Sequence, residues 1–312
     1  MSRFVAFGVA AILLLITLFA FTPVNFAGDL GICLPSPNQW HLPKFLGWLI
    51  NTGLISLSVI IMASANKKYN FIPEVEPMMS MILLLTLACN CLTTSVVSSS
   101  TLLLLCNVLC LYIIITTYEQ MNATREFFIV ASLPAIGAMF QEAFVLMIPV
   151  YIGGGLMMKS FRLREFIAFI FGLIAPYWIA VGMGMISIDA FHFPQTLSAF
   201  SATGVNSKIF LTLLAICIMG VLGLIMALYN GVRLFNRNSR LRCMHFSFNI
   251  MGLVAILALI FNFNNFEAYY GTIALWFAIQ TATLLNLYNV RRSLTVICVT
   301  LAIFLPLYFI AL

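Results

Sequence analysis

The chain contains eleven apolar stretches of fifteen or more residues in which no Asp, Glu, Lys or Arg occurs. A helix needs about 20 mostly apolar residues to cross about 30 Å of hydrocarbon, so each stretch is a candidate membrane span. The polar segments between them are too short to fold as a separate soluble domain. We therefore predict an all-α fold, a polytopic helical membrane bundle of about eleven transmembrane helices in a single domain covering 1–312. The predicted spans are 4–22, 45–63, 78–95, 101–117, 127–141, 143–158, 166–186, 209–230, 246–262, 269–287 and 293–311.

Positive charge is distributed very unevenly between alternate loops. When the stretches are threaded through a bilayer in turn, thirteen of the fifteen Lys and Arg residues fall on one side, and only Lys44 and Lys208 fall on the other. Because loops rich in Lys and Arg stay in the cytoplasm, we predict N-in/C-out, with a cytoplasmic N-terminus and a periplasmic C-terminus. This orientation explains the net charge of +6, so we expect no nucleic-acid partner.

Two segments of the sequence leave the number of membrane spans open. The stretches 127–141 and 143–158 are short and only Gln141 and Glu142 separate them, so they predict either two crossings or one re-entrant hairpin, which would leave nine spans. The first stretch follows Arg3 as a secretory signal would. Its apolar run is long for a signal peptide, which favours a retained anchor.

The predicted spans lack the ionisable groups that ion-coupled transporters carry at membrane depth. We therefore expect no ion coupling through buried charge. Among the eight cysteines, Cys33 and Cys243 lie clearly in loops and the others in spans, which argues against a disulfide framework. We expect no metal site and no cofactor.

Two groups of residues are candidates for contact with lipid or substrate. Pro176 removes a backbone donor from its span, and broken helices often line membrane cavities, so Pro176, Tyr177 and Trp178 are predicted to border a substrate path. The densest run of cations follows the eighth span, where Lys and Arg interact with anionic lipid headgroups. The predicted headgroup ligands are Arg233, Arg237, Arg240 and Arg242.

One region resembles a known family. A charged loop with Arg125, the short pair of stretches, the basic segment FRLREF at 161–166 and the Gly- and Pro-containing GLIAPYW at 172–178 follow in order. This order is similar to a poorly characterised family of polytopic inner-membrane proteins of Bacteroidota. The resemblance implies a bacterial inner (plasma) membrane and brings no catalytic residue with it.

The first outer loop, 23–44, carries Asp29 and His41. An odd number of spans, an N-in orientation and an acid in this loop resemble the membrane glycosyltransferases of the C-type fold, whose first outer loop holds a catalytic acid. The resemblance implies a catalytic role for Asp29. His41 is a second candidate, because imidazole acts as a base near neutral pH, although Trp40 and His41 also suit an interfacial anchor.

These features favour a multi-pass protein that handles a lipid-linked or amphipathic substrate in envelope biogenesis. Membrane lipids and a lipid-linked substrate are the expected partners, and the sequence does not identify a protein partner. Two alternatives stay open, a glycosyltransferase-like enzyme that uses Asp29 and a non-catalytic membrane scaffold.

Overall fold

The computed structural model describes residues 2–20, 31–40, 42–72, 76–187, 207–234, 238–287 and 293–311. The described residues form helices and connecting turns and contain no strand element. The helices are α1 Ser2–Ala20, η1 Pro37–Gln39, α2 Lys44–Tyr69, α3 Glu76–Ala88, α4 Cys91–Thr94, α5 Ser99–Thr116, α6 Thr124–Phe140, α7 Ala143–Leu146, α8 Ile148–Met157, α9 Leu163–Gly182, α10 Ser207–Leu234, α11 Ser239–Phe261, η3 Phe263–Asn265, α12 Phe266–Leu287 and α13 Ser293–Ala311.

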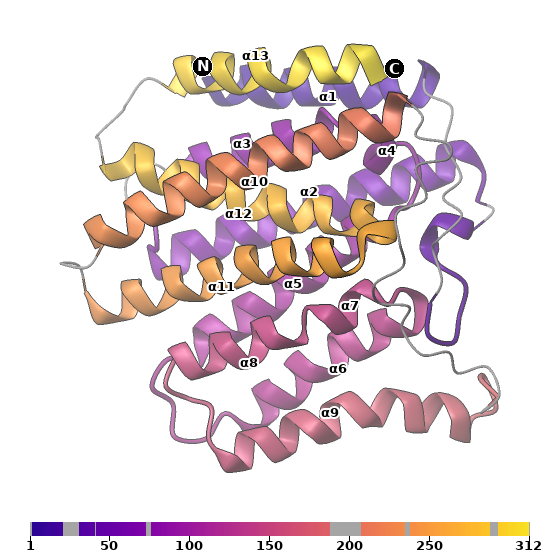
Figure 1. Cartoon of the computed structure of the whole chain (residues 1–312), viewed down its shortest axis with the longest axis vertical. Coiled ribbons are helices and arrows are strands. Elements are labelled where there is room, and N and C mark those ends of the chain that lie inside the picture. Colours follow the sequence, from indigo (N-terminus) through magenta and orange to yellow (C-terminus); the bar gives the residue numbers. More distant parts are fainter. Residues whose placement is uncertain are drawn as a thin grey trace.

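Each predicted span contains at least one helix, so the all-α fold class is confirmed. Among the described helices, five are long and apolar enough to cross a membrane, namely α2, α5, α9, α10 and α11. These helices suit a membrane-embedded protein. The long helices run back and forth between two ends of the bundle, with α1 and α13 along one edge and α6 and α9 along the opposite edge (Figure 1).

The core lies around α12, whose residues are buried along most of their length. Trp276 of α12 is fully buried and lies against Gly223 of α10 and Gly252 of α11. A Cβ atom at position 223 would stand 2.8 Å from the indole ring, and one at 252 would overlap it. Small residues therefore let α10 and α11 approach the largest side chain of the core closely.

The predicted span 78–95 is not one continuous helix. α3 ends at Ala88 and the four-residue α4 begins at Cys91, because the Asn90 side chain accepts the Leu92 amide at 3.1 Å and caps the new helix. Ser98 caps α5 in the same way, with its hydroxyl accepting the Thr101 amide at 3.3 Å. Polar side chains thus supply the hydrogen bonds that a broken helix lacks, although the segment is buried.

The start of α11 also differs from the sequence prediction. The helix begins at Ser239 rather than at 246, so Arg240, Arg242 and His245 lie in its first two turns instead of in a loop. Hydrophobicity marks only the apolar part of a helix, and Arg is itself a good helix former.

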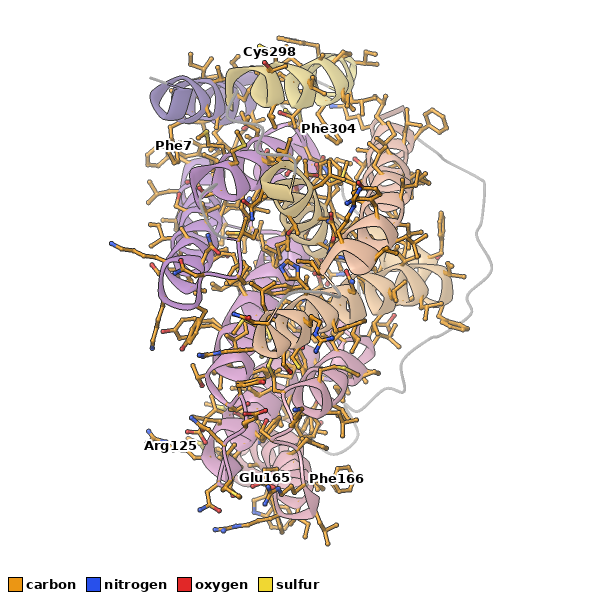
Figure 2. All side chains as sticks on the ribbon, turned by 90° about the vertical axis from the view of Figure 1, so that its left-hand side faces the viewer. Phe7, Arg125, Glu165, Phe166, Cys298 and Phe304 are labelled. Atoms are coloured by element: carbon orange, nitrogen blue, oxygen red, sulfur yellow. The ribbon has the colours of Figure 1, made fainter. Side chains whose placement is uncertain are left out.

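Contacts between distant segments define one end of the bundle. The Arg240 guanidinium lies 5.4 Å from the Tyr69 ring and 5.6 Å from the Tyr118 ring, and Lys159 pairs with Glu119 at 3.2 Å. Since the end of α2, the turns after α5 and α8 and the start of α11 meet here, this end holds most of the described Lys and Arg residues. We call it the basic end; Figure 2 looks onto it, with Arg125 and Glu165 at the bottom of the view.

The other end of the bundle, called here the opposite end, carries the first residues of α2, α5 and α12. Segment 31–40 binds the end of α6 there, because the Leu34 amide donates to the Met139 carbonyl at 2.9 Å. The Trp40 and Phe140 rings also meet edge to face, with centroids 5.7 Å apart. Lys44, the first residue of α2, lies at this end.

Candidate functional site

α6 and α9 pack so closely that their seam shapes the nearby surface. Gly172 of α9 lies against Phe128 and Ala131 of α6, and a Cβ atom at 172 would stand 2.8 Å from the Ala131 Cβ and overlap the Phe128 carbonyl oxygen. Glycine allows this approach because it carries no side chain. Two hollows lie along this seam, one on each side of Gly172 along α9.

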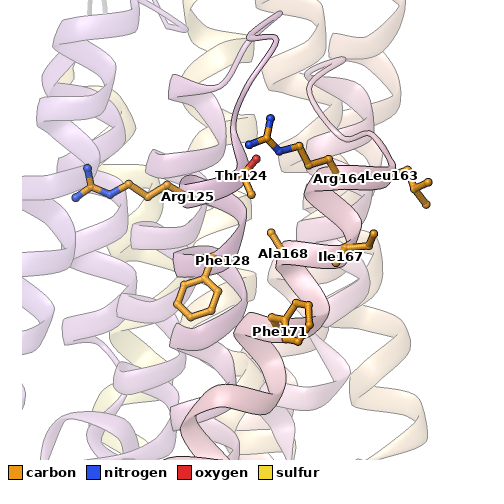
Figure 3. A pocket seen from close by; sticks show the side chains of 8 residues that line it. All are labelled: Thr124, Arg125, Phe128, Leu163, Arg164, Ile167, Ala168 and Phe171. Carbon is orange, nitrogen blue, oxygen red and sulfur yellow. The ribbon is translucent and has the colours of Figure 1, made fainter.

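A hollow of about 820 Å³ opens along this seam at the basic end (Figure 3). Its lining surface is almost entirely apolar, and Thr124, Arg125 and Arg164 are its polar or charged lining residues. The lining residues are Thr124, Arg125, Phe128, Leu163, Arg164, Ile167, Ala168 and Phe171. Figure 3 shows the Arg164 side chain turned from α9 toward Thr124, whereas Arg125 points away from α9. One guanidinium group therefore lies over the mouth of the hollow.

The polar groups at the mouth suit an anionic, hydrogen-bonding ligand. Arg164 donates from Nη1 to the Asn122 Oδ1 at 3.4 Å, a long bond that leaves most of its five donors for other partners. The Thr124 Oγ1 is buried and has no hydrogen-bond partner. A phosphate oxygen between these two side chains would satisfy both.

A second hollow of about 350 Å³ continues along the same seam. It shares Phe128 with the first hollow, and its lining residues are Phe128, Ser132, Ile136, Met139, Ala175, Pro176, Ile179, Ala180 and Met185. The two hollows follow one face of α9 from Arg164 to Ile179, about 22 Å at 1.5 Å per residue. We call them together the α6–α9 furrow, and its length approaches the roughly 30 Å of a hydrocarbon layer.

Two neighbouring loops hold the mouth of the furrow. The Glu119 amide donates to the Met158 carbonyl at 3.0 Å, and the Thr117 and Ser160 hydroxyls are 2.8 Å apart. The hydrogen bond and charge of Lys159 lower the pKa of the Glu119 carboxyl, and Glu119 in turn raises the pKa of the Lys159 ammonium. These contacts fix the loop before α6 against the loop before α9.

The predicted substrate-path residues separate in the structure. α9 continues through Pro176, which lines the furrow. Tyr177 packs beside a small cluster of Met139, Ala180 and Ile186. Trp178 is 78% exposed and lines neither hollow of the furrow. Of the three residues, only Pro176 borders the furrow.

The three described residues among the predicted headgroup ligands make different contacts. Arg233 donates from Nε to the Tyr229 hydroxyl at 3.1 Å. Arg240 lies over two tyrosine rings, and Arg242 lines a separate hollow between α10 and α11. Arg237 lies outside the described residues.

Asp29 and His41 also lie outside the described residues, so the predicted catalytic positions are not placed. Two other acids of the predicted outer side are described and buried. Glu142 accepts the Asn265 amide nitrogen at 2.7 Å, and Glu267 accepts from Asn38 at 3.5 Å. Their exposed fractions are 8% and 5%, although the sequence prediction placed both in loops.

Other site residues were missed by the sequence reasoning. Thr124, Phe128 and Arg164 become neighbours only because α6 pairs with α9 across the intervening α7 and α8. Helical spacing from Phe128 to Ser132 and Ile136 would have shown that they share a face. It would not have shown which helix covers that face.

Within the described parts of the chain, no group of three or more His, Cys, Asp or Glu side chains is arranged to hold a metal ion. Comparisons with protein families, with curated proteins and with solved structures find no match for this chain. The geometry of the sites is therefore what bears on the function of this chain.

Proposed function

We propose that this chain is a multi-pass protein of a bacterial inner membrane that handles a lipid-linked or otherwise amphipathic substrate. The supporting observation is the α6–α9 furrow, in which Arg164 and Thr124 lie above a long apolar seam. A lipid phosphate has the charge and the acceptor oxygens that these two side chains match. Its acyl or polyprenyl chain has the polarity and shape of the seam below.

We also propose an orientation for the bundle in the membrane. The basic end faces the cytoplasm, the chain crosses about eleven times, and α6 and the α7–α8 pair each count as a crossing. Contacts that place Arg240, Lys159 and Arg164 at the basic end support this orientation through the positive-inside rule. The headgroup at Arg164 then belongs to a lipid of the cytoplasmic leaflet.

Photo-crosslinking tests the proposed site. The protein is reconstituted with an anionic phospholipid that carries a diazirine in its acyl chain, and the modified peptides are mapped by mass spectrometry. We expect labels on the furrow-lining residues Phe128, Ile167 and Phe171. Arg164→Gln should reduce this labelling by about tenfold, as the loss of one charge-assisted hydrogen-bonding group predicts.

Arg162→Gln is the matched control, because Arg162 lies two residues earlier, is exposed and does not line the furrow. Its labelling pattern should equal that of the wild type. Labelling that is uniform around the bundle, or that is insensitive to Arg164→Gln, would show that the furrow is only lipid-exposed surface.

A second candidate function is a glycosyltransferase-like enzyme with its site at the opposite end. The observation that favours it is the bond from Asn38 to Glu267, because Asn38 belongs to the same predicted outer loop as Asp29. That loop thus brings polar side chains to a buried acid. Asp29→Asn in a normally folded protein should abolish glycan transfer, and unchanged envelope glycans would exclude this function.

A further inference from the structure

A third hollow lies at the basic end between α10, α11 and α12, apart from the α6–α9 furrow. It is lined by Asn230, Gly231, Leu234, Arg242, His245, Phe246, Asn249 and Gln280. Its volume is about 20 Å³, which is enough for one group of the size of a water molecule. Phe246 at its rim is 51% exposed. A ligand can therefore insert one small group there and leave the rest outside.

The hydrogen bonds around the hollow show which polar atoms of its lining residues have partners. Asn230 donates from Nδ2 to the backbone oxygen and to the Oε1 of Gln280, both at 2.9 Å. Gln280 donates in turn to the Asn249 Oδ1 at 2.7 Å. Because the Asn230 amide nitrogen is engaged, its Oδ1 remains as an acceptor; this atom is buried and has no partner.

His245 supplies a second acceptor of the same kind. Its Nε2 lies 3.0 Å from the Phe71 carbonyl oxygen. A carbonyl oxygen only accepts, so Nε2 carries the proton and Nδ1 of the neutral ring holds a lone pair. The Nδ1 atom is buried without a partner, and the whole residue is 3% exposed.

The number of donors limits which group fits. Two buried acceptors need two donors, and the hollow admits only one small group. A single hydroxyl has one hydrogen to donate and is excluded, whereas a water molecule has two and a primary ammonium has three. Arg242, which lines the same hollow, adds a cation suited to a neighbouring phosphate.

We propose that this hollow binds the phosphoethanolamine head group of a membrane lipid. The ammonium donates to the Asn230 Oδ1 and the His245 Nδ1, and the phosphate pairs with Arg242. The site is separate from the α6–α9 furrow and does not depend on the function proposed there.

Three lipids with identical acyl chains test the proposal on the full chain. Native mass spectrometry compares the binding of phosphatidylethanolamine, phosphatidylcholine and phosphatidylglycerol. Trimethylation in phosphatidylcholine removes all three N–H donors, so we expect phosphatidylethanolamine to bind about tenfold more tightly than phosphatidylcholine. Phosphatidylglycerol, with hydroxyl donors only, should also bind more weakly than phosphatidylethanolamine.

His245→Phe and Asn230→Leu should each reduce the preference for phosphatidylethanolamine, whereas Arg162→Gln, at an exposed residue that lines none of the three hollows, should leave it unchanged. Equal binding of phosphatidylethanolamine and phosphatidylcholine by the wild type would mean that only water fills the hollow, and would overturn the proposal. The proposal would also be overturned if both variants folded and kept the full preference for phosphatidylethanolamine. If either variant fails to fold, the wild-type comparison alone decides.

Discussion

Gly172 of α9 lies directly against the backbone of Phe128 in α6, so close that even a methyl group at 172 would overlap the Phe128 carbonyl oxygen. This contact sets the separation of the two helices whose seam forms the furrow. Along α9, residues on either side of Gly172 line the two hollows, Ile167 and Phe171 in one and Ala175 and Pro176 in the other.

The first prediction concerns this contact. Gly172→Ala should destabilise the protein by about 1–3 kcal/mol, because an added methyl group in a close-packed interface forces the backbones apart. Thermal unfolding in detergent measures the effect. Gly182→Ala, in the last turn of the same helix, is the control; its Cβ would meet no atom within 4 Å, so it should be neutral or slightly stabilising. Equal effects of the two substitutions would contradict this account.

The sequence predicted the helices well because membrane insertion requires an apolar stretch for each of them. It did not predict the break at Asn90, because a capping asparagine looks the same in a sequence as one that hydrogen-bonds between continuous helices. The side chain here accepts the Leu92 amide and also lies 3.5 Å from the Thr212 hydroxyl of α10. Such a role depends on which helices surround the residue.

The sequence alone could not predict that Glu142 and Glu267 are buried, for a similar reason. Their amide partners, Asn265 and Asn38, are 123 and 229 residues away along the chain. A single sequence carries no record of such pairing, so both acids were taken for loop residues. Among the furrow residues, Pro176 was predicted because proline removes a backbone donor from any helix that contains it. The roles of Phe128 and Arg164 could not be predicted in this way, because they arise from the packing of α6 against α9.

The second prediction concerns a buried polar link between α5, α8 and α12. The Tyr151 hydroxyl donates to the Asn107 Oδ1 at 2.6 Å, and Asn107 donates to the Thr272 hydroxyl at 2.8 Å. Asn107→Leu should destabilise the protein by about 1–3 kcal/mol, since it leaves two buried hydroxyls without this partner.

A double-mutant cycle with Tyr151→Phe isolates the bond itself. Interhelical hydrogen bonds in membranes are worth about 0.6 to 1.7 kcal/mol, so the double variant should lose less stability than the two single variants together. Strict additivity would show that the two side chains do not interact. Ser56→Ala, at an exposed site of α2, serves as the neutral reference.

The third prediction concerns pH and the loops at the mouth of the furrow. Lys159 lowers the pKa of the Glu119 carboxyl, so their pair stabilises the folded state above the ordinary carboxyl pKa of about 4.3. That contribution disappears as the pH falls through the lowered pKa. Hydrogen exchange of residues 117–123 should therefore be faster in Lys159→Gln than in the wild type at pH 7, and the difference should shrink as the pH falls below the ordinary carboxyl pKa and Glu119 is protonated. A difference that does not change with pH would rule out the ion pair as its cause.

The fourth prediction tests the proposed orientation with two cysteines in an otherwise cysteine-free protein. Lys44→Cys lies at the opposite end and Met121→Cys at the basic end, where Met121 is 70% exposed. An impermeant maleimide added to the periplasm of intact cells should label position 44 and leave 121 unlabelled until the inner membrane is permeabilised. The native Cys33 is a poorer probe than either, because partial burial raises the pKa of its thiol and reduces the reactive thiolate. Labelling of position 121 in intact cells would place the basic end in the periplasm, and Arg164 would then face the wrong leaflet for a cytoplasmic lipid phosphate.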